Sequence, residues 1–82
     1  MSYGEIARKL NGLVGSDTRV TFDDDQAPKE LRFYRADPLS TELVREALAK
    51  TAACFPSEMA AITTVFVAFD DSLGITRRRV VP

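Results

Sequence analysis

The chain contains no histidine, no tryptophan and a single cysteine, Cys54. One cysteine excludes a disulfide within the chain. A structural zinc site needs several cysteine or histidine ligands at close spacing, and this sequence does not supply them. We therefore expect no metal and no other cofactor. Cys54 itself is expected to pack at the margin of a buried helix face, because no neighbour in sequence would activate its thiol.

Motifs that carry catalysis are also missing. The sequence has no G-x-S-x-G nucleophile motif, no P-loop and no dinucleotide-binding glycine motif. The spacing of its carboxylates does not mark out an acid–base pair. A domain of this size also leaves little room for an enclosed pocket of several hundred Å3. We expect a protein that is not an enzyme and that binds no small molecule.

Long apolar runs are absent too. No stretch approaches the ~20 apolar residues that cross a bilayer, and the first residues lack the layout of a signal peptide. The net charge of −1 gives no overall attraction to nucleic acid or to an anionic membrane. These features favour a cytoplasmic protein without membrane contact, and the single free cysteine agrees with that compartment.

Residues 1–82 are expected to form one small α+β domain. With 45% apolar and 28% charged residues, the composition is that of a folded protein. A chain this short buries only about two-thirds of its unfolded surface, so its core alone gives limited stability. Disulfides and metals are already excluded, and association with another chain is the remaining common source of stability.

The segment Leu39–Phe55 carries the clearest helical pattern. Its apolar residues recur at intervals of three and four, which predicts an amphipathic helix. Ser40 is placed to cap its start, with Leu39 and Val44 at the positions of a hydrophobic staple. Pro56 ends it, because the residue before a proline is disfavoured in helical geometry. The other elements are expected to pack against this helix or beside it.

A shorter helix and four strands surround the central one. Ser2 and Glu5 have the spacing of a capping box, and Gly15 is suited to end the first helix. Beyond Gly15 the apolar period changes from 3.6 to 2, which predicts strands. The predicted strands are Thr18–Phe22, Leu31–Ala36, Ile62–Phe69 and Ile75–Val81.

The elements follow the order α-β-β-α-β-β. The central helix is long enough to return the chain, so the second and third strands are expected to run parallel across a right-handed crossover. The predicted fold is a two-layer sandwich, a four-stranded mixed sheet with two helices on one face. The sequence leaves the strand order open.

Alternation divides this sheet into two faces. The helix-facing side is expected to hold Val20, Phe22, Leu31, Phe33, Val65, Val67 and Phe69. The open side is expected to hold Arg19, Thr21, Arg32, Tyr34, Thr64, Phe66 and Ala68. The last strand adds either Arg78 or the pair Arg77 and Arg79 to the open side.

Arginines and aromatic rings on an open sheet are the residue types that most often dominate protein interfaces. The candidate partner-binding residues are Arg32, Tyr34, Phe66 and Arg78. The leading hypothesis is a small non-catalytic protein-interaction module, such as an adaptor, inhibitor or immunity-type protein. It would form a homodimer, through the open face or the edge strand 75–81, or bind another protein. A purely structural role for the open face is the simpler alternative.

A second hypothesis assigns the same face to single-stranded nucleic acid. Such sites stack bases on aromatic rings and hold the backbone with basic side chains. Two features oppose it. The sequence lacks the glycine-aromatic signature of the common RNA-recognition sheet, and the acidic run Asp23–Asp25 repels phosphate.

Two charge runs have simpler explanations than a site. Asp23–Asp25 lacks the alternating ligand spacing of a calcium-binding loop, so a solvated acidic turn is expected. Arg77–Arg79 lies in a strand, where consecutive side chains point to opposite faces and cannot converge on one ligand. Charged residues on an edge strand more often prevent unwanted sheet pairing.

Overall fold

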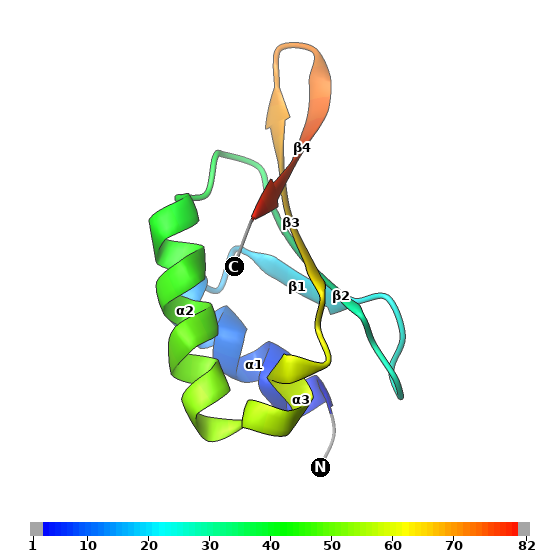
Figure 1. The fold of residues 1–82 in the computed structure, drawn as a ribbon. Coiled ribbons are helices and arrows are strands. Elements are labelled where there is room, and N and C mark those ends of the chain that lie inside the picture. Colours follow the sequence, from blue (N-terminus) through cyan, green and yellow to red (C-terminus); the bar gives the residue numbers. More distant parts are fainter. Residues whose placement is uncertain (1–2, 81–82) are drawn as a thin grey trace.

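Helices cover one face of a four-stranded mixed sheet in a computed structural model that describes residues 3–80 (Figure 1). The elements in chain order are α1 (Tyr3–Val14), β1 (Arg19–Phe22), β2 (Glu30–Arg35), α2 (Thr41–Cys54), α3 (Pro56–Ala60), β3 (Thr64–Asp71) and β4 (Gly74–Val80). The predicted α+β class and element order are confirmed, with the short helix α3 added. None of the helices in the described part of the chain is both long and apolar enough to cross a membrane.

The strands are arranged in the order β1-β2-β3-β4. The two outer pairs are antiparallel, whereas the central strands β2 and β3 run parallel, as expected from the crossover through α2. Parallel central strands place the β1–β2 loop and the β3–β4 turn at opposite ends of the sheet. The β3–β4 hairpin runs past the helices (Figure 1), and residues 70–75, called the arm below, are all exposed.

The start of α2 follows the predicted capping pattern. Ser40 has extended backbone geometry, and its hydroxyl accepts a hydrogen bond from the Leu43 amide at 3.4 Å. Leu39 and Val44 are both buried in the core, consistent with a hydrophobic staple that fixes how the chain enters the helix. The capping box expected for α1 includes Ser2, which lies outside the described residues.

Pro56 ends α2 and also begins α3, a helix of five residues that the apolar periodicity did not predict. Proline is well tolerated at the first position of a helix, because its missing amide would have no helical partner there. A single helical turn is too short to establish a 3.6-residue period, so the sequence pattern gave no signal for it. Cys54, at the end of α2, is exposed rather than packed against the core.

The core lies between the sheet and the helix layer. The largest fully buried side chain is that of Phe33 on β2, and Leu31 on the same strand is equally inaccessible. Ile6 and Leu10 of α1 pack into the same cluster. The remaining buried apolar residues are Val14, Leu39, Val44, Ala47, Val65, Val67 and Val80. The helix-facing residues of β2 and β3 are therefore largely those that the alternation predicted.

Candidate functional site: the open face of the sheet

The strand register brings four arginines and two aromatic rings together on the face that the helices leave open. Directly paired residues in a sheet project to the same side. One row across the sheet consists of Arg19, Tyr34, Ala68 and Arg77. The neighbouring row consists of Thr21, Arg32, Phe66 and Arg79. The predicted membership of this face is confirmed for strands β1, β2 and β3.

Each aromatic ring of this face lies beneath a guanidinium group. The Cζ atom of Arg77 is 5.5 Å from the centroid of the Phe66 ring, and that of Arg19 is 6.0 Å from the centroid of the Tyr34 ring. Both distances fall within the range of cation–π attraction. The rings hold these two arginines against the sheet, so their donors are partly ordered before any partner arrives.

Tyr34 is also anchored by a carboxylate. Its hydroxyl donates a hydrogen bond of 3.0 Å to Asp70, which lies two residues beyond Ala68 on the same face of β3. That hydrogen bond raises the pKa of the Tyr34 phenol, because removing the proton would leave two negative charges side by side. Partial burial adds to the rise, and the positive charge of Arg19 opposes it.

The face is basic, although the whole chain has a net charge of −1. Its four arginines stand against the carboxylates of Asp70 and Glu30 and, near Arg32 at one edge, that of Asp23. Glu30 forms an ion pair with Arg32. Within residues 3–80, Arg19, Arg77 and Arg79 have no carboxylate oxygen within 4 Å. Three guanidinium groups are thus available to negatively charged groups from outside.

Arg78, one of the predicted partner-binding residues, does not lie on this face; the sequence alone leaves the choice between Arg78 and the pair Arg77 and Arg79 open. It lies opposite Val67, a side chain buried under the helix layer, and its Cζ atom is 5.9 Å from the Phe69 ring centroid. Arg32, Tyr34 and Phe66 do share the open face, and Arg77 and Arg79 take the place of Arg78. The pairing of Asp71 with Gly74 determines which β4 side chains point to which face. Alternation within β4 alone does not show this.

Two residues of the acidic run in the β1–β2 loop, Asp23 and Asp24, accept hydrogen bonds from backbone amides of that loop and the start of β2. One carboxylate oxygen of Asp23 accepts hydrogen bonds of 2.9 Å from the amides of Lys29 and Glu30. These bonds, that from Glu30 above all, lower the pKa of Asp23, because they favour its charged form. Asp24 accepts from the amides of Asp25 and Ala27. Among the described residues, no group of three or more histidine, cysteine or acidic side chains is arranged to hold a metal ion.

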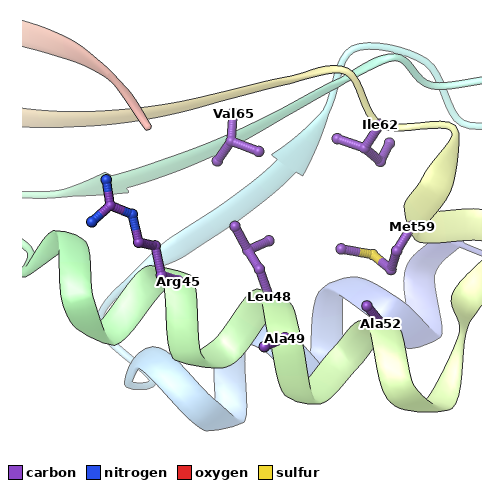
Figure 2. Close-up of a pocket in the computed structure, with 7 residues that line it drawn as sticks. All are labelled: Arg45, Leu48, Ala49, Ala52, Met59, Ile62 and Val65. Atoms are coloured by element: carbon purple, nitrogen blue, oxygen red, sulfur yellow. The ribbon is translucent and has the colours of Figure 1, made fainter. Parts of the chain in front are cut away.

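The helix side of the sheet carries a separate apolar groove, called the α2–β3 groove below. It has a volume of about 350 Å3 and is lined by Arg45, Leu48, Ala49, Ala52, Met59, Ile62 and Val65. Figure 2 shows Leu48 and Val65 directed toward each other from α2 and β3, with Met59 and Ile62 at one end and Arg45 at the other. No residue of α1 is among those that line the groove. Periodicity did not predict it, since it depends on how far the helix layer extends beneath β3.

The fold and this geometry define a small α+β domain with an arginine-rich open sheet. Comparisons with protein-family models, curated proteins and solved structures found no match to the chain.

Proposed function

We propose that the chain is a non-catalytic protein-interaction module whose open sheet face binds an acidic surface of another protein. It would act by occupying that surface, as an adaptor, inhibitor or immunity-type protein does. The observation that carries the proposal is the gathering of Arg19, Arg77 and Arg79, which have no acidic partner within residues 3–80, around two aromatic rings.

The types of residue on this face suit such a role. Arginine and tyrosine are enriched among the residues that contribute most to binding at protein interfaces. Arginine also forms two parallel hydrogen bonds with one carboxylate, which gives directional as well as electrostatic recognition. Because Arg77 and Arg19 already lie over rings, binding restricts less side-chain freedom than it would for free arginines.

A second copy of the chain is a poorer occupant of this face. Two open faces related by a two-fold axis would place four arginines against four others. The outer edge of β4 faces the same difficulty, since pairing two β4 strands brings the run Arg77–Arg79 against itself. Like charges directly opposite each other weaken strand pairing. An acidic partner avoids both costs.

Single-stranded nucleic acid is the second candidate, and the same arrangement favours it. Phosphates would contact the unpaired guanidinium groups, and bases would stack on guanidinium planes or on the rings. The guanidinium groups over Phe66 and Tyr34 leave less ring surface on which bases could stack, so this face suits an acidic protein better than nucleic acid. The two candidates differ in the expected effect of nuclease.

The test uses the three consecutive arginines as their own control. The wild-type chain, the Arg77→Gln/Arg79→Gln double variant and the Arg78→Gln variant are each used to capture partners from a lysate of the source cells, with and without nuclease. A protein partner captured by wild type and Arg78→Gln, lost with the double variant and unaffected by nuclease supports the proposal.

Nucleic acid captured with the same dependence on Arg77 and Arg79, and released steeply as salt rises, would support the second candidate instead. Equal capture by the double variant and by wild type would contradict any role for the open face. The Arg78→Gln variant separates the loss of one positive charge from the loss of this particular surface.

A further inference from the structure

The arm exposes two large apolar side chains to solvent. Leu73 at its tip is 96% exposed and Ile75 is 69% exposed, and they are the two large apolar residues so exposed in residues 3–80. The arm lies beyond the helices (Figure 1), in keeping with this exposure. Because the hairpin runs past the helices, an apolar side chain at its tip can reach a groove on another chain.

The turn holds Leu73 in this exposed position. The carboxylate of Asp71 accepts a hydrogen bond of 2.8 Å from the Leu73 amide and another from the Thr76 hydroxyl. Gly74 follows with a φ of 116°, a geometry that glycine adopts at little cost. Because the backbone on both sides of Leu73 is fixed, binding through this residue needs little further ordering of the turn.

The α2–β3 groove is complementary to this tip. Its lining is apolar apart from Arg45, and its volume of about 350 Å3 admits a leucine side chain with part of its turn. Arg45 has no carboxylate oxygen within 4 Å in the described part of the chain. The arm carries two carboxylates, Asp70 and Asp71, next to its apolar tip. An apolar tip beside acidic groups thus matches an apolar groove with a basic end.

The tip cannot reach the groove of its own chain. Ile62 and Val65 line the groove near the start of β3, whereas the arm begins at the other end of that strand. The four steps from Val67 to Asp71 alone span ~13 Å of strand, directed away from the groove. The occupant that fits is therefore the arm of a second copy.

We propose that the chain forms a two-fold dimer in which each copy places Leu73 in the α2–β3 groove of the other, with the Asp71 carboxylate toward Arg45. A two-fold axis makes the two contacts identical and closes the assembly at two chains. The groove lies on the helix side of the sheet, so the dimer leaves the open face uncovered. The proposal is independent of the function proposed above and supplies the association that so small a core favours.

The test is the mass of the chain over a range of concentrations, by sedimentation equilibrium. Wild type is expected to form a dimer that dissociates on dilution. Leu73→Asp should weaken dimerisation at least tenfold, whereas Ser72→Asp, with the same charge on the adjacent turn residue, should not. Ala52→Glu, which places a carboxylate in the groove, should weaken it similarly. Ala53→Glu on the exposed side of α2 is its control.

Mixing the two defective variants gives the sharpest result. The Leu73→Asp chain keeps an intact groove and the Ala52→Glu chain keeps an intact tip, so one of the two contacts can form between them. The mixture is expected to form more dimer than either variant alone. Far-ultraviolet circular dichroism and thermal unfolding of each variant verify that it is folded.

Three results would overturn the proposal. They are a monomeric wild type at every concentration, a dimer unaffected by Leu73→Asp in a folded chain, and open-ended polymers in place of dimers. Loss of dimer in an Arg77→Gln/Arg79→Gln variant with Leu73→Asp unaffected would assign association to the open face instead. The first three results do not bear on capture of an acidic partner, so the two proposals fail separately.

Discussion

Tyr34 and Asp70 are 36 residues apart in sequence and are joined by a hydrogen bond of 3.0 Å between the phenol and the carboxylate. The bond ties the two central strands together on the open face, where the sheet passes into the arm. It also places an acidic group within the most basic surface of the chain. Its strength can be measured, because it changes the ionisation of the phenol.

The pKa of Tyr34 is expected to fall when Asp70 is neutralised. In Asp70→Asn the charge that disfavours tyrosinate is removed, so the raised pKa should move down toward the ordinary value of 10.0. A Tyr3→Phe background leaves Tyr34 as the single tyrosine, and tyrosinate absorbance then follows it alone. Arg19→Gln is the opposite control, since losing that cation should raise the pKa further. An unchanged titration in Asp70→Asn would show that the bond does not persist in solution.

Asp23 is expected to make stability depend on pH in acid. Its pKa is lowered in the folded state by hydrogen bonds from backbone amides, so its charged form stabilises the fold above the unfolded pKa, near 3.8. This contribution is lost as the pH falls through the lower folded value. Asp23→Asn should therefore be less stable than wild type at pH 7, and the difference should shrink below pH ~4. Urea unfolding at several pH values measures it, with Asp25→Asn as the control for removing one charge from the loop.

Two glycines near the end of α1 should respond oppositely to alanine. Gly12 is exposed within the helix, and an added Cβ meets no atom within 4 Å, so Gly12→Ala should stabilise the fold by ~0.5–1 kcal/mol. Gly15 has a φ of 115°, and a Cβ there would lie 2.9 Å from a carboxylate oxygen of Asp17. Gly15→Ala should destabilise by at least ~1 kcal/mol. Chemical denaturation of both variants provides the comparison, and equal effects would contradict the described end of α1.

Phe33 and Phe66 lie on opposite faces of adjacent central strands and should differ in their contribution to stability. Phe33 is fully buried, and Phe33→Ala should cost ~3–5 kcal/mol through lost burial and the cavity left behind. Phe66 is half-buried beneath Arg77, and Phe66→Ala should cost roughly 1 kcal/mol. Equilibrium unfolding measures both free energies. A larger loss for Phe66 than for Phe33 would mean that the buried and open faces are assigned the wrong way round.

Within-strand alternation and helical periodicity predicted much of the fold. The cap at Ser40, the parallel β2–β3 pairing and the split of side chains between the two faces all follow from local patterns that agree with one another. Burial supports this reading, because Leu31 and Phe33 alternate with Arg32 and Tyr34 along one strand. Where one face of a strand is buried, shifting its pairing register by one residue would turn every apolar side chain toward solvent. The register of such a strand is therefore strongly specified.

For β4, the face to which each side chain points could not be predicted in the same way. Arg77, Arg78 and Arg79 carry the same side chain, so the alternation of this segment has no apolar and polar side to distinguish. Their faces follow from the two-residue turn and from Val80, which is buried opposite Val65. The short helix α3 and the α2–β3 groove escaped prediction for a related reason. Both depend on how separate elements pack, which no local period records.

The parallel pairing of β2 with β3 also has a consequence for how the chain folds during synthesis. Residues 36–63 lie between the paired ends of the two strands, so β1 and β2 leave the ribosome well before β3 exists. Closing so long a loop is slower than forming either hairpin. Until β3 pairs with β2, one edge of β2 has no strand beside it and Phe33 lacks its neighbour Val67. Pulse-labelling hydrogen exchange during refolding should therefore find the amides bonded within the β1–β2 and β3–β4 hairpins protected before those bonded between β2 and β3. The interval between the two is when the chain is most exposed to aggregation.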